Sequence, residues 1–138
     1  MKTYTGKIVD LKSNQRYCFG ANTQGRHGKG AALIAKIRFG AIQGVPKGPQ
    51  GQSYAIVTKD LTKKVHPSIS KEYIIEQIKE LYQYADYNSE LEFFIIYSGT
   101  GHTLNAYTPE EMAIMYSCSK IPDNFVFEEE FAKLLILE

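Results

Sequence analysis

The chain has 138 residues and a formal net charge of +1, with 43% hydrophobic and 22% charged residues. This length and composition are typical of one globular domain over residues 1–138, which buries enough apolar surface to fold without disulfides or metal. The near-zero charge argues against DNA or RNA as a partner, because a protein that neutralises many phosphates carries a basic excess. A small anionic ligand is compatible with this charge.

The cysteines and the N-terminal segment indicate a reducing compartment. Cys18 and Cys118 form no CxxC motif, so we expect no disulfide and no metal site, with both side chains buried as small apolar groups. Residues 1–12 contain no apolar run of signal-peptide length, and no stretch approaches the roughly 20 apolar residues of a membrane span. We therefore expect a cytoplasmic protein with no membrane contact and no cofactor.

In chain order, the first half of the sequence predicts three short strands and one helix. Residues 8–9 indicate an edge strand, and the aromatic run over residues 16–19 indicates a β-strand. After a glycine-dense segment, apolar residues near helical spacing predict a helix over residues 31–39, which Gly40 ends. Residues 40–51 carry four glycines and two prolines and are predicted to be a loop, and residues 53–58 form the next strand.

The second half continues the alternation of helix and strand. Ser70 is a suitable N-cap for an amphipathic helix that ends near Tyr87. Residues 91–97 are apolar without alternation, as expected for a strand covered on both faces. Thr108, Pro109 and Glu111 indicate a capping box and a helix to about residue 117. Residues 125–127 predict a last strand and residues 129–137 a closing helix.

This alternation predicts an α/β fold with a mostly parallel sheet and helices on both faces. Ligands of open α/β sheets bind at the carboxyl ends of the strands. Three segments, residues 20–30, 58–67 and 98–108, leave predicted strands at those ends. We therefore expect them to meet at one edge of the sheet and to form one site.

The first of these segments has the composition of an anion-binding loop, because glycines let backbone N–H groups turn toward a phosphate at a helix N-terminus. It is no Walker A motif, since Arg26-His27 stands where Lys-Ser/Thr is required, and Leu33 replaces the third glycine of the dinucleotide fingerprint. Residues 98–101 have the same small, glycine-rich composition directly after the apolar strand. The alternative is that both segments are tight turns that bind no ligand.

Four polar side chains are candidates for chemistry in such a site. Asn22 fits a ribose or water contact, or equally an Asx-turn. His27 and His102 can act as acid or base near neutral pH, or serve as hydrogen-bonded loop residues. Asp60 ends a predicted strand and can be a base, an adenine ligand, a helix cap or a solvated side chain. Lys29, Lys47 and Lys59 are also explained as surface charges.

The glycine-rich motifs also resemble those of a known family. Gly20-Ala21-Asn22, followed by Gly28-Lys29-Gly30-Ala31-Ala32 at a helix start, resembles the first ligand loop of macrodomains. Ser98-Gly99-Thr100-Gly101 resembles their second, diphosphate-gripping loop. The runs GRHGKGAA and GQSYAIVTKD look like a smaller bacterial and bacteriophage branch of macro-like proteins.

The resemblance implies a three-layer α/β/α sandwich that binds ADP-ribose or a related nucleotide, with Asn22 near the distal ribose and Asp10 a weak match for the acidic adenine ligand. The diphosphate would lie between the two loops. The ligand-binding residues expected on this basis are Gly20, Ala21, Gly28, Lys29, Gly30, Ala31, Ser98, Gly99, Thr100 and Gly101.

Two functions remain open at this point. One is a hydrolase of an ADP-ribosyl or phosphoester bond, with Asn22, His27, Asp60 and His102 as catalytic candidates. The other is a non-catalytic module that reads or sequesters a nucleotide signal. Ala31 and Ala32 stand where many hydrolytic macrodomains carry an acidic residue, which favours binding.

Overall fold

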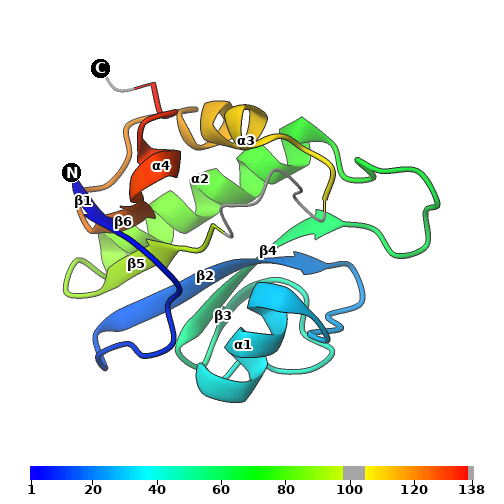
Figure 1. Cartoon of the computed structure of the whole chain (residues 1–138), viewed down its shortest axis with the longest axis horizontal. Helices are drawn as coiled ribbons and strands as arrows, with labels where there is room; N and C mark the ends of the chain where they lie inside the picture. The colour runs from blue at the N-terminus through cyan, green and yellow to red at the C-terminus, as the bar shows by residue number, and fades with distance from the viewer. Residues whose placement is uncertain (98–104, 137–138) are drawn as a thin grey trace.

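The computed structural model describes residues 1–97 and 105–136. Its strands form one six-stranded sheet in the order β1-β6-β5-β2-β4-β3 (Figure 1). Neighbouring strands are parallel except for the β3–β4 pair, which confirms the predicted α/β class and mostly parallel mixed sheet. The elements are β1 (Lys2–Tyr4), β2 (Gln15–Asn22), α1 (Gly30–Arg38), β3 (Gly48–Gln50), β4 (Ser53–Lys59), α2 (Lys71–Tyr87), β5 (Glu92–Ile95), α3 (Pro109–Tyr116), β6 (Phe125–Glu128) and α4 (Glu129–Ala132).

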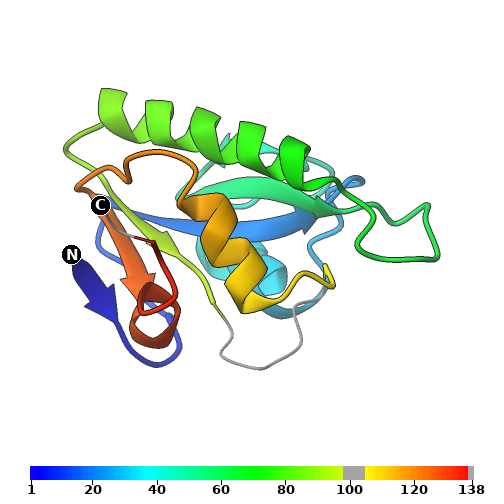
Figure 2. The same cartoon turned by 90° about the horizontal axis from the view of Figure 1, so that it is seen from above.

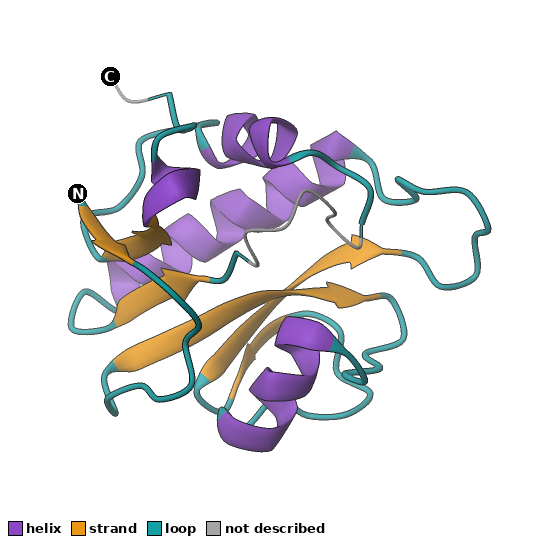
Figure 3. Ribbon diagram, in the orientation of Figure 1, coloured by secondary structure: helices purple, strands orange, loops and turns teal. Residues whose placement is uncertain are grey.

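Apolar side chains cover both faces of the central strand β2. Cys18 belongs to the larger buried cluster, with residues of α2 and α3, whereas Tyr17 and Phe19 belong to a second cluster with residues of α1. Successive side chains of a strand point to opposite faces, so the two clusters lie on opposite sides of the sheet. Figures 2 and 3 show α1 on one side of the strands and α2 on the other.

Capping and edge contacts fix α2 and α3 in place. The Ser70 hydroxyl accepts a hydrogen bond from the Tyr73 N–H, and Thr108 and Glu111 form a complete capping box at α3, as predicted. Gln77 of α2 is buried and pairs with both backbone groups of Val57, at 2.7 Å to its N–H and 2.9 Å to its carbonyl. Gln77 thus occupies hydrogen-bonding positions of β4 that the short β3 leaves open.

The structure corrects several predicted elements. The N-terminal edge strand is β1 at Lys2–Tyr4, whereas residues 8–9 form no strand. The predicted loop over residues 40–51 contains β3, which tolerates Pro49 because it is an edge strand. The closing helix is the short α4, and β5 is shorter than predicted. Both cysteines are free, but Cys118 is only half-buried.

Candidate functional site

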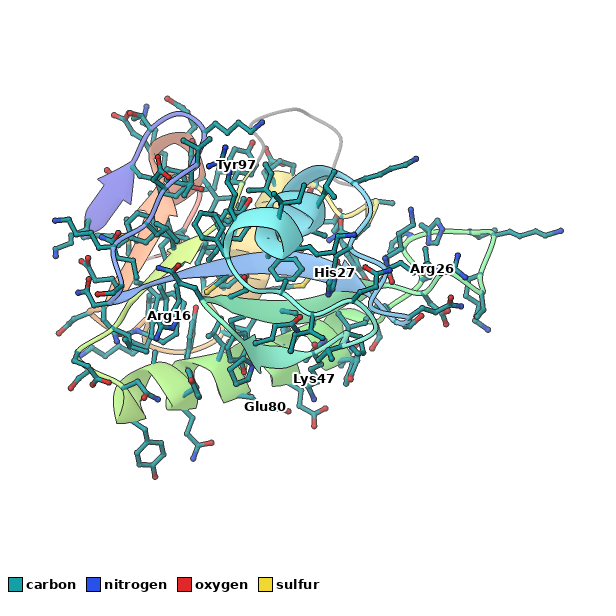
Figure 4. All side chains as sticks on the ribbon, turned by 90° about the horizontal axis from the view of Figure 1, so that it is seen from below. Arg16, Arg26, His27, Lys47, Glu80 and Tyr97 are labelled. Carbon is teal, nitrogen blue, oxygen red and sulfur yellow. The ribbon has the colours of Figure 1, made fainter. Side chains whose placement is uncertain are left out.

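The carboxyl ends of β2, β4 and β5 lie at one edge of the sheet because these strands are parallel. A cavity of about 330 Å³ opens at this edge. Figure 4 shows Arg26 and His27 near this end and Arg16 at the other end of β2. The residues that line the cavity are Gly20, Ala21, Asn22, Arg26, Gly28, Lys29, Ala31, Ala32, Thr58, Lys59, Leu61 and Asn105. Segments that follow β2 and β4, and the segment before α3, therefore meet there as expected.

The residues that line this cavity have a net positive charge. Arg26, Lys29 and Lys59 contribute three cations, and the cavity's described lining contains no Asp or Glu. In the part of the chain that the structure describes, none of these three cations forms an ion pair. Their charges are therefore available to an anion, and we refer to this space as the cationic cavity.

The N-terminus of α1 adds a second source of positive potential. Lys29 is the N-cap residue, but its side chain makes no capping hydrogen bond in the described structure, and the first turn of α1 carries no acidic residue. The first N–H groups of a helix have no partner within the helix and carry a partial positive charge. Gly30 has a φ of 55°, a left-handed conformation that glycine adopts readily.

Asn22 lies in the lining, but its side chain is occupied by the loop that follows it. Its Oδ1 accepts hydrogen bonds from the N–H groups of Arg26 at 2.9 Å and Gln24 at 3.2 Å. Its Nδ2 donates to the Arg26 carbonyl at 2.8 Å. The register of β2 against β4 shifts immediately before Asn22. Asn22 therefore shapes this turn, as its Asx-turn interpretation implies.

His27 is fully buried and is not among the residues that line the cationic cavity. Its Nε2 lies 3.2 Å from the Val45 carbonyl, and its ring packs edge-on against Phe19 with 5.3 Å between the ring centroids. Since a carbonyl only accepts, Nε2 carries the proton. Nδ1 has no hydrogen-bond partner among the described residues. This placement gives His27 no contact with a ligand in the cavity.

Asp60 is held in a turn beside the cavity, which its neighbours Lys59 and Leu61 line. Its Oδ1 accepts hydrogen bonds from the Thr62 hydroxyl at 2.6 Å and the Thr62 N–H at 2.9 Å. These bonds lower the pKa of Asp60 below its ordinary value. A carboxylate with a lowered pKa is a weaker base, so this environment does not suit general-base catalysis.

A second cavity of about 520 Å³ also borders the start of α1 and shares Ala31 with the first. We refer to it as the tyrosine cavity. Its lining residues are Tyr4, Gly6, Lys7, Ile8, Tyr17, Gly30, Ala31, Ile34, Ile96, Tyr97 and Glu128. The Tyr4 hydroxyl donates to the Ile95 carbonyl at 2.8 Å and accepts from the Tyr97 N–H at 3.2 Å. Burial raises the pKa of Tyr4, which keeps this hydroxyl neutral.

The structure thus places the predicted site residues in three groups. Gly20, Ala21, Asn22, Gly28, Lys29 and Ala31 line the cationic cavity, and Gly30 lines the tyrosine cavity with Ala31. His27 and Asp60 line neither. The predicted residues Ser98, Gly99, Thr100, Gly101 and His102 lie outside the described residues.

Sequence reasoning missed Arg26, Ala32, Thr58, Leu61 and Asn105, and explained Lys59 as a surface charge. Thr58, Lys59 and Leu61 could have been found, because they lie at or just after a predicted strand end. Asn105 carries no local signal, since only the folded chain brings it to this edge.

Among the described residues, no helix has the length and apolar character needed to cross a membrane, and no three His, Cys, Asp or Glu side chains group as metal ligands. Comparisons with protein-family models, with curated proteins and with solved structures find no match for this chain.

Proposed function

We propose that this protein binds an ADP-ribose-like nucleotide across the N-terminus of α1, in a macrodomain-like three-layer α/β/α sandwich. The observation that carries the proposal is the pair of cavities that share Ala31, one basic and the other rich in tyrosine. A ligand that spans both would cross the first turn of α1, where helix N–H groups favour a phosphate.

The chemistry of the two cavities suggests how such a ligand is oriented. The tyrosine cavity offers the half-buried ring of Tyr97 and the apolar side chains of Ile8 and Ile34 to a planar base. The diphosphate would lie along Gly28 and Ala31, within reach of Lys29. The distal ribose would then enter the cationic cavity, on the side of Asn22. This orientation agrees with the roles that the macrodomain resemblance implies.

The described residues favour binding over hydrolysis. The described lining of the cationic cavity contains no His, Asp or Glu to activate a water molecule. His27 is buried behind the loop, and hydrogen bonds lower the pKa of Asp60. We therefore propose a module that reads or sequesters a nucleotide signal. Hydrolysis, with His102 as acid or base, is the competing hypothesis.

Calorimetric titration with ADP-ribose tests the proposal, with NAD, AMP and cyclic ADP-ribose as comparison ligands. We expect micromolar affinity for ADP-ribose and weaker binding of AMP, which lacks the diphosphate and the distal ribose. No heat with any of the four ligands would contradict the proposal. Chromatography of ADP-ribosyl substrates after incubation separates the two functions: intact substrate supports a binding module, and product that disappears in His102→Ala supports a hydrolase.

A further inference from the structure

The loop that carries the cationic cavity packs against a segment that does not itself line the cavity. Gly25, with a φ of 65°, lies so close to residues 44–45 that a Cβ on it would meet the carbonyl carbon of Gly44 at 2.6 Å. The Gly44 N–H donates to the Gly25 carbonyl at 2.9 Å. This contact between two backbones leaves no room for a side chain at Gly25.

Two further hydrogen bonds join the same two segments through His27, and Gln50 braces the second segment internally. The carbonyl of Val45 accepts hydrogen bonds from His27 Nε2 at 3.2 Å and from Gln50 Nε2 at 3.1 Å. Gln50 Oε1 accepts from the Ile42 N–H at 2.7 Å, and Gln43 Oε1 accepts from the His27 N–H at 3.1 Å. We refer to His27, Gln43, Val45 and Gln50 as the His27 network.

Burial of the His27 network disfavours other arrangements of its hydrogen bonds. His27 is 0% exposed and Gln50 is 4% exposed. A buried polar group that loses its partner costs more than a normal hydrogen bond contributes, because water cannot replace the partner. Displacement of the loop would leave the His27 Nε2 donor without its acceptor at Val45. The observed position of the loop is therefore favoured over alternatives.

The His27 network acts on the proposed binding site through the chain itself. His27 directly precedes Gly28, and Gly28 and Lys29 line the cationic cavity immediately before α1 begins. Fixing the backbone of His27 therefore fixes where the next residues direct their N–H groups. Preorganised donors bind an anion more tightly, since less ordering is required on binding.

We propose that His27 is a positioning residue, which holds residues 28–31 in their anion-binding geometry from the buried side of the loop. It does not touch the ligand and acts through Gly28 and Lys29. The identity of the ligand in this inference rests on the proposed function. The claim that His27 orders the loop rests only on the His27 network.

Two His27 variants separate hydrogen bonding from packing. His27→Phe keeps a buried ring but removes the donor to Val45, whereas His27→Gln keeps an N–H donor at a similar distance along the side chain. His66→Phe is the matched control, because His66 lies in another loop and pairs with Ser68. Amide hydrogen exchange of Gly25, His27 and Gly44 is measured by NMR, with the amides of α2 as an internal reference, and ADP-ribose affinity by calorimetry.

We expect His27→Phe to accelerate exchange at these three amides about tenfold and to weaken ADP-ribose binding about fivefold, with α2 unchanged. His27→Gln should recover most of both losses, and His66→Phe should behave as wild type. Exchange and affinity that are unchanged in His27→Phe would overturn the proposal, as would a His27→Gln protein no better than His27→Phe.

Gln43→Ala provides a second test that places little demand on folding, because Gln43 is exposed. It should accelerate exchange of the His27 amide about threefold, whereas Gln83→Ala, on the exposed side of α2, should not. If the wild-type protein binds no ADP-ribose, the proposed function fails, but the exchange data still decide whether the network orders the loop. Equal acceleration in α2 in both His27→Phe and Gln43→Ala would overturn the positioning role.

Discussion

The side-chain amide of Asn22 hydrogen-bonds to both the backbone N–H and the backbone carbonyl of Arg26, at 2.9 and 2.8 Å. These two bonds close the turn between β2 and the glycine-rich start of α1 without any ligand. Arg26 is one of the residues that line the cationic cavity. Asn22 therefore determines the shape of the proposed site through Arg26, and its amide need not contact the nucleotide.

Replacement of Asn22 by Ala should weaken both the loop and ligand binding. We expect a loss of about 1 kcal/mol in the free energy of unfolding and about tenfold weaker ADP-ribose binding, because the three loop hydrogen bonds of the Asn22 side chain are lost together. Chemical denaturation and calorimetry measure the two effects. Asn14→Ala, at the exposed opposite end of β2, should change neither. Lost binding at unchanged stability would instead indicate a direct contact between Asn22 and the ligand.

The cation of Lys59 should contribute to affinity by electrostatic attraction. We expect Lys59→Ala to weaken ADP-ribose binding about fivefold at low ionic strength, and the difference to shrink as salt screens the charges. Lys120→Ala removes an exposed lysine that does not line the cavity and serves as control. If Lys59→Ala and Lys120→Ala have equal affinities across the salt range, the cationic cavity does not hold the anion.

The Thr62 hydrogen bonds should make the carboxylate of Asp60 sensitive to acid. The pKa of Asp60 in the folded protein lies below its unfolded value of about 4. The ionised carboxylate therefore stabilises the fold above that pH, and this contribution is lost as the pH falls through the folded-state pKa. NMR titration should show the Asp60 pKa rising toward its ordinary value in Thr62→Val but not in Thr5→Val. An unchanged pKa in Thr62→Val would remove the Thr62 hydroxyl as a cause, since the N–H of residue 62 remains.

Long, strongly patterned elements of the fold could be predicted from the sequence, whereas short edge strands could not. The apolar stripe of α2 and the cap at Thr108 carry local signals that the folded chain retains. β1 and β3 have three residues each, and their pairing comes from neighbouring strands instead of their own side-chain pattern. β2 extends past its aromatic run to Asn22 because β4 pairs with its glycine-containing end.

The candidate site was predictable in its backbone but not in its side chains. Glycines that open onto a helix are a local signal, and Gly28 and Lys29 line the cavity. The composition of this loop does not predict whether the His27 side chain faces the cavity or the protein interior. Its ring packs on Phe19, and its hydrogen-bond acceptor is Val45, which follows α1 in the sequence and approaches only in the folded chain.

The central claim is that an anion binds where Gly28 lies, and two substitutions at this position test it most directly. A Cβ on Gly28 would meet nothing within 4 Å and Gly28 is exposed, so Ala fits there and the side chain of Glu starts from open space. Calorimetry with ADP-ribose should show Gly28→Ala within about twofold of wild type, while Gly28→Glu, which places a carboxylate in the cationic cavity, should lose at least about tenfold in affinity at equal thermal stability. ADP-ribose binding by Gly28→Glu equal to that of Gly28→Ala would contradict the account.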